Sequence, residues 1–262
     1  MTEITAYAPG TFCWAELSTS DARGAKRFYS RLFGWKSNGF PSATNARYTI
    51  MQIDGLDVAA LYEEESEPSP VSAPSWMTYV AVDDVDATAR RAEELGATVI
   101  LQPFDLLDTG RMAMLRDPQG AVFAVWHGRS HIGAGLVNEP GAICWHELST
   151  SNAESARSFY RRLFNWAEER RTGDDNEYTV FRCGTASAGG MLQVDPLVSG
   201  NGAEWLVYFS VDDCDDAVAY ARQLGATVLT PPKDVTGVGR FAVLRDPQGA
   251  VFAVLTAESE AA

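Results

Sequence analysis

The sequence predicts an α+β protein of two tandem domains, each a pair of βαβββ modules that share one mixed sheet with the helices outside. Three observations support this prediction. Long segments of the first half recur about 130 residues later, which is the spacing of a repeated domain. Within each half, strand-like and helix-like segments follow in the same order twice. The chain has 262 residues, 46% of them hydrophobic, as expected for two ordinary folded domains.

The repeat is carried by three pairs of matching segments. GTFCWAELSTSDARGAKRFYSRLFGW (10–35) matches GAICWHELSTSNAESARSFYRRLFNW (141–166), WMTYVAVDDVDATARRAEELGATVI (76–100) matches WLVYFSVDDCDDAVAYARQLGATVL (205–229), and RMAMLRDPQGAVFAV (111–125) matches RFAVLRDPQGAVFAV (240–254). The segment between the halves is rich in glycine and polar residues, so it is expected to be a linker. The predicted organisation is a first domain at 8–126 (modules about 10–62 and 75–126), a linker at 127–140, and a second domain at 141–256 (modules about 141–195 and 204–255).

The first module begins with an alternating, aromatic-rich segment at 12–17 that predicts a strand. Thr19, Ser20 or Asp21 can then cap a helix, which Gly34 is placed to end. Short strands are expected at 35–37, 48–53 and 58–61. The apolar positions of the helix follow i, i+3, i+4, i+7 spacing, at Ala25, Phe28, Tyr29, Leu32 and Phe33.

The second module repeats the order, with a strand at 76–82, a helix at 84–95 ended by Gly96, and strands at 97–101, 111–116 and 121–126. The sequence RDPQG at 116–120 predicts a tight hairpin because proline presets φ, aspartate bonds back into the turn and glycine accepts positive φ. The acidic stretch at 63–70 is expected to be a loop joining the modules, and the tail at 257–262 is expected to fray.

Charge and composition exclude several classes of partner. The chain carries 35 acidic and 21 basic side chains, for a net charge of −14, so no nucleic acid and no anionic membrane surface is expected as a partner. No apolar run approaches the roughly 20 residues of a membrane span, and the amino terminus lacks the pattern of a secretory signal, which predicts a cytoplasmic protein. Three histidines and four scattered cysteines argue against a histidine-rich metal site or a disulfide framework.

The paired modules, the FYxxLFGW helix end, the VDDVDA strand-to-helix junction and the DPxG hairpin resemble the vicinal oxygen chelate superfamily, specifically its tandem actinobacterial members labelled glyoxalase-like or hydroxylase-like. That superfamily includes glyoxalase I, extradiol dioxygenases and bleomycin-resistance proteins. The resemblance implies sheets rolled into an open cup, with metal ligands on the first and last strands of the modules. The residues at those positions are unsuited to a divalent metal, so no metal and no cofactor is predicted; they are Trp14, Met77, Ala124, Trp145, Leu206 and Ala253.

Under the resemblance, strand alternation predicts an apolar and aromatic cup lining with one carboxylate and one phenol per domain. Glu16 and Glu147 are the candidate acid/base residues, because burial among aromatics raises a carboxylate pKa toward neutrality. The alternatives are that the aromatics only fill two cores and that the carboxylates pair with arginines at a rim. The candidate ligand-binding residues are Trp14, Met77, Tyr79, Arg111, Trp126, Trp145, Leu206, Tyr208 and Arg240.

Three functions remain open from the sequence. The first is a metal-independent enzyme or accessory protein that binds and transforms a hydrophobic or aromatic small molecule in secondary metabolism. The second is a drug-sequestering protein of the bleomycin-resistance type, for which the negative charge favours cationic ligands. The third, opposed by the missing ligands, is a metal-dependent lyase or dioxygenase. The chain is expected to be a monomer or a homodimer.

Trp126 of the first half stands where the second half has Leu255. His127 and His131 are expected to lie in a solvated linker, and His146, which replaces Ala15 of the first half, is expected on the strand face opposite Trp145. The glycine-rich segment SAGG (187–190) is expected to stand where the first half has AALY (59–62). One cup is expected to be functional and the other structural, and the sequence leaves open which.

Overall fold

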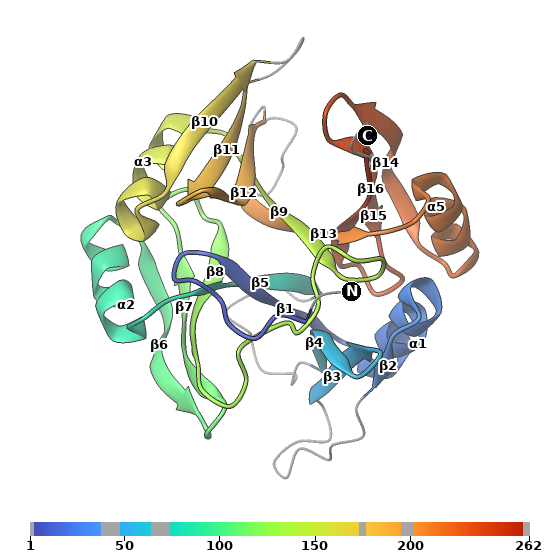
Figure 1. Ribbon diagram of the computed structural model, residues 1–262, viewed down its shortest axis with the longest axis horizontal. Helices are drawn as coiled ribbons and strands as arrows, with labels where there is room; N and C mark the ends of the chain where they lie inside the picture. Colours follow the sequence, from blue (N-terminus) through green and yellow to red (C-terminus); the bar gives the residue numbers. More distant parts are fainter. Residues whose placement is uncertain (1–2, 38–47, 64–73, 173–176, 195–201, 259–262) are drawn as a thin grey trace.

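The computed structural model describes residues 3–37, 48–63, 74–172, 177–194 and 202–258. The predicted acidic loop therefore lies outside the described residues except for Glu63, which ends a strand, and the tail lies outside them after residue 258. Two eight-stranded mixed sheets form the molecule, one from each half, as the repeat predicts (Figure 1).

The first sheet has the strand order β2-β3-β4-β1-β5-β8-β7-β6. Its central strand β1 pairs with β4 in parallel and with β5 in the antiparallel sense, so the two modules of the first domain meet between β1 and β5. The strands are β1 (Phe12–Thr19), β2 (Lys36–Ser37), β3 (Tyr48–Ile53), β4 (Leu56–Glu63), β5 (Ser75–Ala81), β6 (Thr98–Leu106), β7 (Gly110–Arg116) and β8 (Val122–Gly128).

The second sheet has the equivalent order, β10-β11-β12-β9-β13-β16-β15-β14. Its modules meet between β9 and β13. The strands are β9 (Ile143–Thr150), β10 (Ala167–Thr172), β11 (Glu177–Cys183), β12 (Ala186–Gln193), β13 (Glu204–Ser210), β14 (Thr227–Val235), β15 (Gly239–Arg245) and β16 (Val251–Ala257).

One helix follows the first strand of each module, and each begins at a side-chain cap. The helices are α1 (Ala22–Phe33), α2 (Val85–Glu94), α3 (Ala153–Phe164) and α5 (Cys214–Gln223). Asp21 caps α1 by accepting a hydrogen bond from the Gly24 amide, and Asn152 caps α3 in the same way. Gly34 ends α1 in the left-handed conformation, with φ of 72°, as its position after the apolar stripe predicts.

The hydrophobic cores join modules of different domains. Figure 1 shows α1 beside α5 and α2 beside α3. Buried Phe28 and Tyr29 of α1 share one cluster with Phe209 and Phe252 of the second domain. A second cluster joins Ala89 and Phe123 of the first domain to Phe159 and Tyr160 of α3. Each module therefore shares its sheet with the other module of its own domain. It shares its helix-side core, the hydrophobic core between the sheet and the helices, with a module of the other domain.

A tyrosine from each domain holds the hairpin aspartate of the other. The Tyr29 hydroxyl donates to Asp246 Oδ2 at 3.0 Å and accepts from Trp76 Nε1 at 3.0 Å. The equivalent Tyr160 hydroxyl donates to Asp117 Oδ2 at 2.9 Å. We call each of these contacts a tyrosine clamp. The two clamps connect the FYxxLF helices to the DPQG hairpins, so both motifs form hydrogen bonds across the domain boundary.

Two details differ from the expectations. Strand β6 extends to Leu106, well past residue 101, because it continues to pair with β7 after two irregularities in register. The alignment of SAGG with AALY was wrong by two residues. Glu16 pairs with Ala60 and Glu147 pairs with Gly190, so Gly189 and Gly190 stand in the places of Ala59 and Ala60.

Candidate functional site on the inner face of each sheet

Each sheet has one face that its helices do not cover, and the predicted site lies there. On β7, Ala113 and Leu115 join the core that contains α2, while Met112 and Met114 point to the opposite face. We call this inner face cup one in the first sheet and cup two in the second. Cup one contains a buried cluster without any helix residue, formed by Cys13, Trp14, Ala60, Met77, Tyr79, Ala81, Met112, Met114, Ala124, Trp126 and Ala134.

In cup one, two phenols hold both oxygens of the predicted carboxylate. The Tyr79 hydroxyl donates a hydrogen bond to Glu16 Oε1, and the Tyr48 hydroxyl donates to Oε2 at 3.1 Å. The Trp14 indole N–H in turn donates to Tyr48. The strands β1, β3 and β5 thus bring these four side chains into one network.

Cup two repeats this network. The Tyr208 hydroxyl donates to Glu147 Oε1 at 3.0 Å, and Tyr178 also bonds to the carboxylate. Trp145 Nε1 donates to the Tyr178 hydroxyl at 3.0 Å. Gly190 makes room for this arrangement, since a Cβ there would lie 1.8 Å from the Tyr178 oxygen and 2.9 Å from Trp145 Nε1. We refer to the two sets as the Trp–Tyr–Glu–Tyr networks.

Burial raises the pKa of both carboxyl groups, which is the direction expected from the sequence. Desolvation raises the pKa of Glu16 above its ordinary value of 4.5, against the lowering effect of the bonds from Tyr79 and Tyr48. The pKa of Glu147 is raised in the same way, and the charge of Lys233 opposes the shift together with the two phenols. The pKa of Tyr79 is raised as well, by burial and by the Glu16 charge, so that phenol stays protonated as a hydrogen-bond donor.

Tyr48 and Tyr178 are the site residues that sequence reasoning missed. Tyr48 begins β3, and Tyr178 is the second residue of β11. Tyr48 was expected only as part of a strand at 48–53, and no role was predicted for Tyr178. A signal was present, since the dipeptide Tyr-Thr occurs at 48–49 and again at 178–179, with the spacing of the repeat. In each sheet one strand, β4 or β12, separates the strand of the tyrosine from the strand of the carboxylate, so the recurrence alone does not place the phenol beside the carboxylate.

The linker covers cup one, and this corrects the expectation of a solvated loop. The Ala134 amide donates to the Cys13 carbonyl at 2.8 Å, and the carbonyl of His131 accepts from Trp126 Nε1 at 3.0 Å. The His131 ring packs edge-on to Trp14, with centroids 4.8 Å apart, and its side chain is 17% exposed. His127 is the exposed one of the pair, and its Nδ1 lies 3.0 Å from the Val82 carbonyl oxygen.

Cup two is more accessible than cup one at equivalent positions. Trp14 is 4% exposed, Met77 4% and Trp126 6%, and all three are buried. Their counterparts Trp145, Leu206 and Leu255 are each partly exposed. Three further residues of cup one are buried, namely Cys13, Met112 and Met114. Their counterparts in cup two are partly exposed, namely Cys144, Phe241 and Val243.

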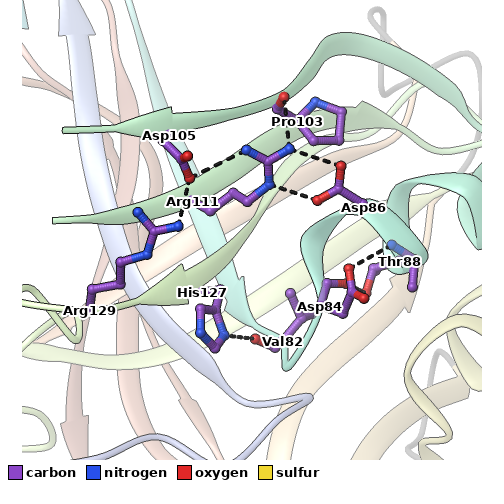
Figure 2. A network of polar contacts seen from close by, with 10 residues as sticks. Val82, Asp84, Asp86, Thr88, Pro103, Asp105, Arg111, His127 and Arg129 are labelled. Carbon is purple, nitrogen blue, oxygen red and sulfur yellow. Dashed lines mark hydrogen bonds and ion pairs between the residues drawn. The ribbon is translucent and has the colours of Figure 1, made fainter. Parts of the chain in front are cut away.

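Arg111 and Arg240 do not join the cups, and the reason is strand alternation. Arg111 lies on the face of β7 opposite Met112, where it forms a two-bond ion pair with Asp86 of α2 at 2.7 and 2.8 Å and a further one with Asp105 at 3.3 Å (Figure 2). Arg240 likewise pairs with Asp215 of α5 and with Asp234. Both arginines tie a helix to a sheet edge, so we leave them out of the candidate site.

His146 lies between the two domains and outside cup two. Its ring stacks on Phe12 of the first domain, with centroids 4.1 Å apart, and Nδ1 lies 2.7 Å from the Thr78 hydroxyl. Burial lowers its pKa to about 3. A neutral imidazole in this position fills the domain interface.

The donor groups in the cups do not fit a divalent metal. Within the described residues, no group of three or more His, Cys, Asp or Glu side chains is placed to hold a metal ion. In the part of the chain that the structure describes, each network contains one carboxylate. Phenolic hydrogen bonds reach both of its oxygens in cup one and at least Oε1 in cup two. In cup one, the other residues of the cluster offer indole, phenol, thioether and alkyl groups, which are poor ligands for Mn²⁺, Fe²⁺ or Zn²⁺. The cluster also contains one thiol, Cys13, which donates to the Tyr79 carbonyl and whose pKa burial raises, so it is held in the protonated form that does not bind a metal.

Comparisons with known proteins match both halves of the chain. The family model "Glyoxalase/Bleomycin resistance protein/Dioxygenase superfamily" matches residues 11–125 and again 142–254. A Mycobacterium tuberculosis protein named "Putative glyoxylase CFP32" is 39% identical, with 97% of this chain and 98% of the relative covered. The anthracycline biosynthesis protein DauV of Streptomyces sp. (strain C5) is 35% identical, with 96% and 95% covered.

A solved structure shows the same fold at low identity. The Mn(II)-bound glyoxalase from Novosphingobium aromaticivorans superposes with a TM-score of 0.66 at 19% identity, over 95% of this chain and 82% of that one. Among the described residues, no helix is both long and apolar enough to cross a membrane. Two matched domains, the paired-module sheets and the relatives along the full length agree, and the chain belongs to the Glyoxalase/Bleomycin resistance protein/Dioxygenase superfamily.

Proposed function

We propose that this protein is a metal-independent member of its superfamily that binds, and transforms by proton transfer, a flat hydrophobic or aromatic small molecule. The observation that carries the proposal is the Trp–Tyr–Glu–Tyr network, in which a carboxylate of raised pKa stands among aromatic side chains on a helix-free face. Aromatic walls supply stacking and apolar contact, and a few fixed polar groups supply orientation.

The chemistry assigned to the network is general acid/base catalysis. A carboxyl group whose pKa is raised toward neutrality can give a proton to a ligand oxygen and take one from an acidic C–H or O–H group. The two phenols fix the carboxyl group in one orientation, because each donates to it and stays protonated. No oxidation is assigned to this site. The relatives named for anthracycline biosynthesis support a substrate from secondary metabolism, where fused aromatic rings are common.

Binding and metal dependence are tested together. We expect 1,8-dihydroxyanthraquinone to quench the tryptophan fluorescence saturably, with the same dissociation constant before and after dialysis against EDTA. Elemental analysis should find less than a tenth of an equivalent of Mn, Fe, Zn or Ni per chain. A stoichiometric bound metal, or binding that EDTA abolishes and Mn²⁺ restores, contradicts metal independence.

Glu147→Gln and Glu16→Gln separate catalysis from simple sequestration. With a substrate that the wild type converts, we expect Glu147→Gln to lower kcat by about a hundredfold or more while binding is retained, because glutamine keeps the shape and loses the transferable proton. Turnover unchanged in both variants would exclude the assigned role. Tight binding of aromatic ligands without conversion of any of them favours a sequestration protein.

A further inference from the structure

Lys233 makes cup two chemically different from cup one. It lies on β14, and its Nζ sits 4.9 Å from the centre of the Phe241 ring. Phe241 contacts the ring of Tyr208, with centroids 5.9 Å apart, and the Tyr208 hydroxyl bonds to Glu147. A continuous line of contacts therefore leads from an ammonium group to the carboxylate of the network. The charge of Lys233 also acts on Glu147, whose pKa it lowers.

Cup one has no cation at the corresponding place. Lys233 stands opposite Phe241 in the pairing of β14 with β15, and Phe104 stands opposite Met112 in the equivalent pairing of β6 with β7. Phe104 packs against the buried cluster of cup one. Both cups thus contain a Trp–Tyr–Glu–Tyr network, and cup two also has the positive charge of Lys233 on its edge strand β14.

The charge of Lys233 is available to a ligand. Its side chain is exposed, and it forms no salt bridge with any residue in the part of the chain that the structure describes. Arg240, on the neighbouring strand, is by contrast held by both Asp215 and Asp234. The aromatic ring below the ammonium group keeps it near the cup without neutralising it.

We propose that cup two is the ligand-binding cup and that Lys233 makes it selective for flat aromatic molecules that carry an anionic oxygen, such as a carboxylate or an ionised phenol. The ring system packs against Trp145 and Phe241, the anionic oxygen meets Lys233, and a neutral oxygen reaches the Glu147 network. This inference rests on the small-molecule function proposed above. Cup one, closed by the linker, serves as a folded core.

The net charge of −14 does not oppose this selectivity at contact distance. At physiological ionic strength, charges farther apart than about 8 Å are largely screened, so the nearby ammonium group dominates the field on a bound anion. The overall charge slows the approach of anions, and this affects the association rate more than the affinity.

Three matched probes test the inference by isothermal titration calorimetry with the full chain. The probes are anthraquinone-2-carboxylate, the uncharged anthraquinone-2-carboxamide and the cationic 2-(aminomethyl)anthraquinone. We expect one carboxylate bound per chain, about three- to tenfold tighter than the amide, with the amine weakest. Lys233→Met should bring the carboxylate to the affinity of the amide and leave the amide unchanged. The control Lys36→Met, on the exposed edge strand β2, should change neither.

The outcomes distinguish this inference from the function on which it rests. Equal affinity for carboxylate and amide, a preference for the amine, or a preference that survives Lys233→Met overturns the inference and leaves small-molecule binding standing. Two bound carboxylates per chain overturn the assignment of the site to cup two alone. If none of the three probes binds, the proposed aromatic-ligand function itself is contradicted, and the selectivity with it.

Discussion

At the scale of single residues, the site is a carboxylate whose ionisation the protein resists. Glu16 is held by Tyr79 and Tyr48 in a cup that the linker closes, and burial raises its pKa. A raised carboxylate pKa means that the folded state binds the proton more tightly than the unfolded state does. The resulting contribution to stability is complete below about pH 4.5 and is lost as the pH rises through the pKa of the folded state.

Glu16→Gln should therefore stabilise the protein at alkaline pH relative to acidic pH. Glutamine cannot ionise, so the variant escapes the cost of burying a charge at pH 8, while at pH 5 the two proteins are more nearly equal. The measurement is the difference in Tm between variant and wild type at pH 5 and at pH 8. Glu93→Gln, at an exposed position of α2, is the control for the loss of one negative charge from the protein. A difference in Tm for Glu16→Gln that is the same at pH 5 and pH 8 would contradict a carboxyl group whose pKa is raised in the folded state.

Strand alternation was enough to predict which side chains of neighbouring strands share one face, while their role in binding stays a proposal. Trp14, Glu16, Met77 and Tyr79 come together because successive side chains of a strand point to opposite faces. Arg111 was misplaced because it flanks a cup residue in sequence while pointing to the helix side, where Asp86 of another element binds it. The partner that decides such a position is distant in sequence, and no local pattern identifies it.

At the scale of elements, the tyrosine clamps explain why the FYxxLF helices and the DPQG hairpins both recur. Tyr29 and Asp246 are separated by 217 positions, and each has an ordinary local interpretation as a helix core residue or a turn residue. The helices, caps and hairpins could thus be predicted from short-range periodicity and turn chemistry. The contact between them could not, because it depends on how two folded domains pack.

Tyr29→Phe should lower the free energy of unfolding by about 1–3 kcal/mol, because it leaves the buried Trp76 N–H without its acceptor and removes a donor from Asp246. Urea denaturation followed by tryptophan fluorescence measures this change. Tyr220→Phe, at a position 41% exposed, should cost no more than about 0.5 kcal/mol. Equal costs for the two variants would show that the clamp hydroxyl contributes nothing.

At the scale of the whole molecule, the two halves share their hydrophobic cores. Each helix-side core contains residues of both domains, and the clamps cross between them in both directions. Neither domain can lose its fold without exposing apolar surface of the other. The sequence predicted two domains but not this exchange of cores, since a repeat shows that units are similar and says nothing about which faces they share.

We therefore expect a single unfolding transition for the whole chain. Thermal melting curves from far-UV circular dichroism and from tryptophan fluorescence should coincide, and the calorimetric enthalpy should equal the van't Hoff enthalpy. Two separated transitions, or a calorimetric enthalpy about twice the van't Hoff value, would indicate domains that unfold independently.

The linker over cup one has a consequence for how such a protein arises. Two identical chains that pair have twofold symmetry, so any segment that covers one cup must also cover the other. Once the halves are fused, a single connecting segment joins them, and in this chain it lies across the first cup through Ala134 and His131. Fusion therefore breaks the equivalence of the two cups before any substitution does. The second cup can then differ from the first, as it does where Lys233 stands in the place that Phe104 has in the first half.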